Sequence, residues 1–203
     1  MFPDTVLQLG QSQRFVILVD LLKSRLYVVK NTKYGPRLQK DYYISSGKKG
    51  WDKFKEGDKK TPVGVYFVTE FLSQKQLPDF YGTGAFPINY PNEWDKRLKK
   101  TGYGIWLHGT PFYTYSRPPR ASDGCVALTN PDFSSIIDQV KVGITPVVIS
   151  DRVKWVSQAE WQKEKRKFIP DLAKWREIWL KGDYKHSLDY YSREFHNGSH
   201  NYS

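Results

Sequence analysis

Up to about residue 150, short apolar runs and alternating hydrophobic and polar positions follow one another, with turn residues between them. Runs of this length that are rich in Val, Ile and aromatic residues are typical of β-strands. The first two runs, 14–20 and 25–30, predict a hairpin that turns near Lys23-Ser24. Further strands are expected at 37–45, 64–69, 86–90, 104–108, 125–128 and 145–149. So many short strands favour a mainly β fold with minor α, of the β-sandwich type.

One clear helix is expected in this region, at 131–140, where apolar residues recur with helical spacing after Thr129 or Asp132 as a cap. Beyond Asp151 the spacing becomes helical throughout. We therefore divide the chain into a catalytic domain at 1–151 and a helical C-terminal segment at 152–203.

Local signals place three helices in the C-terminal segment. Ser157 and Glu160 form a capping-box pattern that opens the first helix. Pro170 suits the first turn of a second helix, which Gly182 can end. Aromatic and leucine residues from Tyr184 to Phe195 predict the third.

The composition is basic and aromatic: the 203 residues carry a net charge of +11, and 16% of them are Phe, Trp or Tyr. This charge predicts attraction to polyanions, but no nucleic-acid-binding motif accompanies it, so nucleic acid is not an expected partner. No run approaches the roughly 20 apolar residues that span a bilayer. Met1–Asp4 lacks the features of a signal peptide. Segment 48–60, with six lysines among three acids, is expected to be an exposed, mobile loop.

The chain has one cysteine, Cys125, in Ser122-Asp123-Gly124-Cys125-Val126. His108 is the only histidine before position 186, and Gly109 follows it. A lone thiol is often a small buried hydrophobe. A thiol and an imidazole that each lie beside glycine at an end of an apolar run instead favour a cysteine nucleophile with a histidine base. His108 would take the thiol proton and later deliver it to the leaving amine.

Gly124 lets the backbone approach a carbonyl substrate, and the amides of Gly124 and Cys125 are expected to form an oxyanion hole. These groups together specify acyl transfer through a thioester. Zinc is the alternative for Cys plus His, but catalytic zinc needs about three protein ligands, and Asp123 beside Cys125 would point away. We therefore expect no metal and no other cofactor, and interpret His186, His196 and His200 as surface residues.

Several motifs occur in an order known from one family. His108-Gly109-Thr110 precedes Ser122-x-Gly124-Cys125-Val126, and both follow Lys60-Thr61-Pro62-Val63-Gly64-Val65-Tyr66. Between them stand Phe86-Pro87-Ile88-Asn89-Tyr90-Pro91-Asn92 and Gly102-Tyr103-Gly104-Ile105-Trp106-Leu107-His108. Over roughly residues 13–150 the chain resembles the L,D-transpeptidase (YkuD-type) catalytic domain.

The resemblance implies a β-rich fold, a periplasmic or cell-envelope location and peptidoglycan stem peptides as substrate. The cysteine would attack the bond between the L-centre of the third, diamino-acid residue and D-Ala. A second stem peptide then resolves the thioester in a transpeptidase, whereas water does so in an L,D-carboxypeptidase, and the residues leave that choice open. The residues that we expect to contact the stem peptide are Tyr90, Gly109, Tyr113, Tyr115, Ser122 and Asp123; Trp106 is interpreted as strand packing.

Two positions depart from the family pattern, which usually has His where Asp123 stands and Arg where Ala127 stands. Arg117 or Arg120 would bind the substrate carboxylate in place of the missing arginine, or would only hold the loop. The departures and the helical tail resemble a proteobacterial subgroup with a C-terminal nuclear-transport-factor-like module. Segment 172–195 would then be the opening helices of that module, here truncated.

One alternative from another class is a non-catalytic wall-binding module with a basic, aromatic surface. Thiol reactivity separates the two, because a low pKa of Cys125 supports catalysis whereas an inert buried thiol supports the binding module. The motifs do not encode the acceptor or the oligomeric state.

Overall fold

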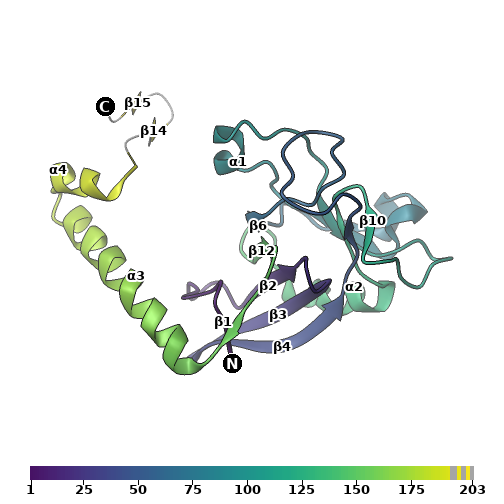
Figure 1. Ribbon diagram of the computed structural model, residues 1–203, viewed down its shortest axis with the longest axis horizontal. Coiled ribbons are helices and arrows are strands. Elements are labelled where there is room, and N and C mark those ends of the chain that lie inside the picture. Colours follow the sequence, from purple (N-terminus) through teal and green to yellow (C-terminus); the bar gives the residue numbers. More distant parts are fainter. Residues whose placement is uncertain (193–195, 198–199, 202–203) are drawn as a thin grey trace. The chain divides into compact units, whose positions relative to one another are not determined.

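The computed structural model describes residues 1–192, 196–197 and 200–201 (Figure 1). The chain forms two units, Met1–Val156 and Ser157–Ser203. The sequence predicts the boundary after residue 151, which is five residues too early. Strand β13 (Trp155–Val156) lies beyond residue 151, but it pairs with β1 (Phe2–Pro3) and so belongs to the first unit. No helix among the described residues is both long enough and apolar enough to cross a membrane.

A five-stranded sheet forms one layer of the first unit, in the order β4-β3-β2-β12-β6. The expected hairpin is confirmed, with Ser24 at its turn in the left-handed region (φ 54°). The central strand β2 is buried along its whole length because both faces of the sheet are covered. The strands are β2 (Phe15–Asp20), β3 (Arg25–Thr32), β4 (Gly35–Tyr43), β6 (Gly64–Phe67) and β12 (Pro146–Ser150).

A four-stranded sheet in the order β11-β9-β8-β7 forms the second layer. One hydrophobic core joins the layers: Ile17 and Leu26 of the first sheet share it with Phe86, Leu107 and Val126 of the second. The mainly β, sandwich-type fold with minor α is thereby confirmed. The strands are β7 (Leu72–Ser73), β8 (Gly84–Pro87), β9 (Trp106–His108) and β11 (Val126–Ala127).

Helix α2 (Asn130–Ile136) closes this core, with Phe133 and Ile136 fully buried. Its predicted cap is confirmed, because the Thr129 hydroxyl accepts a hydrogen bond from the Asp132 amide (3.2 Å). The short elements are β5 (Ser46–Gly47), η1 (Gln74–Gln76), η2 (Asp79–Tyr81), α1 (Glu93–Arg97), β10 (Arg120–Ser122) and η3 (Ile137–Gln139).

The second unit begins with one long helix, α3 (Gln158–Leu180), which the predicted Ser157 capping box opens. The expectation of a new helix at Pro170 is wrong, because Pro170 lies inside α3. A proline removes one backbone hydrogen-bond donor, and the other backbone hydrogen bonds of this 23-residue helix keep the chain helical on both sides of Pro170.

The third expected helix is shorter than predicted. Gly182, at φ 70°, follows α3, and α4 (Tyr184–Ser187) and η4 (Leu188–Tyr190) come next. Phe195 lies outside the described residues. Two short strands, β14 (His196–Asn197) and β15 (His200–Asn201), pair with each other.

The lysine-rich loop 48–60 is more ordered than its composition predicts. Lys53 is only 3% exposed, and its ammonium donates to Asp58 (2.8 Å) and to the Lys55 carbonyl (3.1 Å). The Asp58 carboxylate also accepts the amides of Phe54, Lys55 and Lys60. Burial by itself raises the pKa of Asp58, but these bonds outweigh it and lower that pKa to about 2.

We expect Asp58→Ala to lower the free energy of unfolding by about 3 kcal/mol, because it leaves the Lys53 ammonium buried and unpaired. Since the pKa of Asp58 is lowered in the folded state, this difference should be full above pH 4 and shrink as the pH falls towards 2. Urea unfolding at several pH values measures it. Asp138→Ala, at an exposed carboxylate, is the control with little expected change.

Candidate active site

The parallel pairing of β9 with β11 brings Cys125 and His108 to the same side of the second sheet. In this register Leu107 lies opposite Val126 and His108 opposite Ala127. Side chains alternate along a strand, so the buried Leu107 and Val126 face the core while their neighbours face outward. Trp106, His108 and Cys125 consequently share the outer face.

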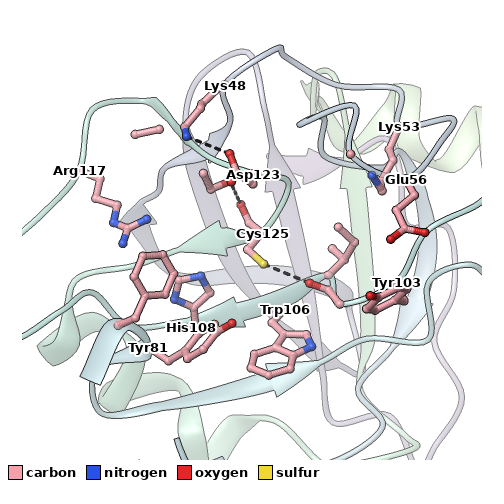
Figure 2. Close-up of a pocket in the computed structure, with 16 residues that line it drawn as sticks. Lys48, Lys53, Glu56, Tyr81, Tyr103, Trp106, His108, Arg117, Asp123 and Cys125 are labelled. Carbon is pink, nitrogen blue, oxygen red and sulfur yellow. Dashed lines mark hydrogen bonds and ion pairs between the residues drawn. The ribbon is translucent and has the colours of Figure 1, made fainter. Parts of the chain in front are cut away.

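These three side chains line a cavity of about 620 Å³ (Figure 2). Loop 48–60 contributes Lys48, Lys53 and Glu56 to its wall. The thiol and the imidazole that the sequence singled out therefore meet in one accessible cavity.

The His108 side chain is nearly inaccessible at 1% exposure, and its ring is held on two sides. Nδ1 contacts the carbonyl oxygen of Gly109 at 2.5 Å, so Nδ1 carries the proton and Nε2 keeps its lone pair. Tyr81 packs edge-on against the imidazole with 5.1 Å between ring centroids. Burial lowers the pKa of His108 to about 4, and the imidazole is neutral at pH 7.

The Cys125 thiol donates to the carbonyl oxygen of Gly104 (3.3 Å), the bond drawn from the sulfur in Figure 2. Burial raises the pKa of Cys125 to about 11, although the Trp106 amide and the Arg117 guanidinium act in the opposite direction. The pKa of the resting thiol is raised and not lowered, so thiol acidity in the resting state does not by itself favour catalysis over the wall-binding module. The resting pair consists of a neutral thiol and a neutral imidazole because both groups are desolvated.

Gly124 allows a close backbone approach, but its amide is not free. The amide donates to the Ser122 hydroxyl (3.1 Å), which itself donates to the Cys125 carbonyl (2.6 Å). A Cβ at Gly124 (φ 134°) would lie 2.8 Å from the Lys60 carbonyl oxygen. Ser122 thus fixes the turn before the thiol, which corrects the expectation of a free Gly124 amide. Ser122 also lines the cavity, and its contact with substrate stays a prediction.

Gly109 is not among the cavity-lining residues, and it acts on the site through His108. Its carbonyl orients the imidazole, and a Cβ at this position would lie 2.2 Å from the side-chain oxygen of Asn130. Asn130 accepts the amides of Thr83 and Thr110 and donates to the Thr110 carbonyl. This network fixes the loop after β9 and with it the orientation of His108.

The structure distinguishes between the two candidate arginines. Arg117 lines the cavity, with its guanidinium stacked 4.4 Å from the centre of the Phe80 ring. Its own carbonyl accepts the Tyr43 hydroxyl (2.8 Å), which anchors the segment. Arg120 is not among the cavity-lining residues and stacks on Trp51 instead.

Three tyrosines expected at the substrate lie elsewhere. Tyr90 is 5% exposed, packs against Tyr66 and donates to the Thr101 carbonyl (3.1 Å), so it is a core residue. Tyr113 and Tyr115 are 85% and 76% exposed and do not line the cavity. Asp123 does line the cavity with Cys125, so the expectation that its side chain points away is wrong, and it forms an ion pair with Lys48 (2.9 Å).

Sequence reasoning missed part of the cavity wall. Trp106, expected to pack inside the sheet, lies on the cavity face because it alternates with the buried Ile105 and Leu107. Its ring packs there against that of Tyr81, with 4.7 Å between the ring centroids. This alternation is the sequence signal that could have identified Trp106 as a cavity residue. Burial and the nearby sulfur raise the pKa of Tyr81, so its phenol stays protonated. No sequence signal linked Tyr81 to residues so distant along the chain.

Residues 14–149 match the family model described as the L,D-transpeptidase catalytic domain (YkuD). The chain belongs to the L,D-transpeptidase family. This match covers more than half of the chain and includes Cys125, His108 and the whole cavity. A search of curated proteins found no match.

Two solved structures extend the similarity. Bd1075 from Bdellovibrio bacteriovorus shares 37% identity at a TM-score of 0.86, covering 99% of this chain and 72% of that one. The Campylobacter jejuni protein Pgp2, described as a helical cell shape determining protein, shares 29% identity at a TM-score of 0.71, covering 90% of this chain and 63% of Pgp2. This chain therefore spans less than two thirds of Pgp2. A nuclear-transport-factor-like module at the C-terminus stays a prediction.

We expect iodoacetamide to alkylate Cys125 slowly at pH 7, with a rate that rises about tenfold per pH unit and does not level off by pH 10, because only the thiolate reacts. Mass spectrometry of the labelled protein measures the rate. A cysteine-containing peptide, whose rate levels off above its pKa of about 8.5, is the control. A plateau reached by pH 7 would show instead a preformed thiolate.

Proposed function

We propose that this protein is a peptidoglycan L,D-transpeptidase that acts on the stem tetrapeptide through a thioester at Cys125. One observation carries the proposal: a thiol, a neutral imidazole and a guanidinium line one accessible cavity in a chain of this family. The family and the description of Pgp2 as a cell shape determining protein support a role at the wall, and we place the protein in the periplasm or cell envelope.

The neutral pair defines the first step. When substrate displaces the thiol from the Gly104 carbonyl, the thiol proton passes to Nε2 of His108 as the sulfur attacks the carbonyl carbon of the third residue. The protonated imidazole then gives this proton to the nitrogen of D-Ala, the C–N bond breaks and a thioester remains. Because the pKa of resting His108 is about 4, the imidazolium holds its proton weakly and readily transfers it to the leaving amine.

Stabilisation of the tetrahedral intermediate needs hydrogen-bond donors close to the oxygen of the attacked carbonyl. The Cys125 amide is our first candidate, since the Gly124 amide is engaged by Ser122. The Tyr81 phenol, which stays protonated beside the imidazole, is the second.

Arg117 is the residue that we propose for the terminal carboxylate of D-Ala. Stacking on Phe80 orients its planar guanidinium, and a carboxylate accepts two parallel hydrogen bonds from such a group. The guanidinium then also lies near the thiol and lowers its pKa, which favours attack. Ala127, where the family usually has arginine, is buried and pairs with Ser45, so it leaves that role open.

The acceptor decides between two reactions that share this first half. An amine of a second stem peptide gives a cross-link, whereas water gives a tripeptide as in an L,D-carboxypeptidase. We expect purified protein with tetrapeptide muropeptides to release D-Ala, and Cys125→Ala to lose this release while keeping its fold. Mass spectrometry of products and circular dichroism measure the two effects.

Cross-linked dimers among the products would support the transpeptidase, and tripeptides alone the carboxypeptidase. Turnover by Cys125→Ala equal to that of the wild type would overturn the cysteine mechanism. Absence of D-Ala release by the wild type, together with retained binding to wall material, would favour the non-catalytic module.

We expect Arg117→Gln to lower kcat/KM for tetrapeptide about 10- to 100-fold, as loss of a charge-assisted carboxylate contact implies. A tetrapeptide that ends in D-alaninamide has no such carboxylate, so the same substitution should lower its turnover much less, and only through the loss of the positive charge near the thiol. Arg120→Gln is the matched control and should leave both substrates unaffected. An equal loss with both substrates would overturn the carboxylate contact and would leave Arg117 a role in the structure or in the charge near the thiol.

A further inference from the structure

The candidate active-site cavity carries opposite charges on two sides of the sulfur. Figure 2 shows Arg117 on one side of Cys125, above His108, and Glu56 with Tyr103 on the other side. A substrate that reaches across the sulfur therefore meets a guanidinium at one end and a carboxylate at the other.

The carboxylate of Glu56 has no ion-pair partner within the part of the chain that the structure describes. Lys53 lies in the same wall, but it is paired with Asp58 at 2.8 Å. The Glu56 backbone is held independently of its side chain, because its amide donates to the Thr101 hydroxyl (3.2 Å). The acidic group is thus held at the cavity by a fixed loop and available to a ligand.

The ring of Tyr103 adds a second feature that suits a cation. Tyr103 lines the cavity and is 76% exposed, so its face is accessible. A tyrosine face attracts an ammonium, and a carboxylate beside it supplies the hydrogen-bond acceptor that the ammonium needs.

We propose that Glu56 and Tyr103 form an ammonium subsite that selects stem peptides by the side-chain amine of their third, diamino-acid residue. This inference rests on the proposed function, which puts the carbonyl of that residue at the sulfur and the D-Ala carboxylate at Arg117. The side chain of the third residue branches from the α-carbon, which lies across the attacked carbonyl from D-Ala. Glu56 stands on that side.

The test compares two tetrapeptides, one with a free side-chain amine at the third residue and one with that amine acetylated. We expect wild-type protein to release D-Ala from the free-amine peptide with a kcat/KM about tenfold higher, as a charge-assisted hydrogen bond implies. Glu56→Gln should remove this preference by slowing the free-amine peptide, with the acetylated peptide unchanged. Glu70→Gln, at an exposed carboxylate outside the cavity, is the matched control.

Binding measured by calorimetry in the Cys125→Ala background separates this inference from the proposed function. An amine preference in Kd that depends on Glu56 supports the subsite even if wild-type protein releases no D-Ala. Turnover with equal kcat/KM for both peptides overturns the subsite and leaves the proposed function intact. A Glu56→Gln effect confined to cross-linking, with D-Ala release unchanged, also overturns it and would assign Glu56 to the acceptor amine.

Discussion

The pairing register of β9 and β11 is the constraint on which the active-site geometry depends. Because Leu107 and Val126 occupy the core, the outer face of the same two strands receives His108 and Cys125. The Leu128 amide donates to the His108 carbonyl (2.8 Å) and locks this register beyond the strand. A slip of one residue would bury the thiol and expose core side chains. The burial that stabilises the core therefore also aligns the catalytic dyad that we propose, Cys125 and His108.

Burial then sets the charge state of that dyad. Removing both groups from water raises the pKa of the thiol and lowers that of the imidazole, and the two shifts together disfavour a preformed ion pair. Arg117 favours the thiolate and disfavours the imidazolium at once. The resting site therefore keeps its proton on sulfur. Under the proposed function, thiol activation would then depend on substrate binding, which limits side reactions of a free thiolate.

Local patterns predicted much of the fold, because hairpin alternation, the Thr129 cap and the Ser157 capping box depend on residues close in sequence. The dyad was predicted for a similar reason, since glycines flank both of its members. Tyr90 was assigned wrongly because proximity along the chain to the site does not tell core from cavity. Lys53 and Asp58 could not be paired in advance, because only the folded loop shows which of its six lysines is buried.

The proposed function gives charge two roles, one through the net charge of the whole protein and one through individual charges inside the cavity. Under the proposed function, the net charge of +11 would attract anionic wall polymer over roughly a Debye length, about 10 Å, without selecting a particular peptide. Inside the cavity the order of charges matters instead of their sum. Under the proposed function and the inferred ammonium subsite, a tetrapeptide bound in the productive direction would place its carboxylate at Arg117 and its ammonium at Glu56, whereas the reversed peptide would replace both attractions with repulsions. Two opposite charges on either side of the sulfur would thus select direction as well as composition, which a uniformly basic cavity would not do.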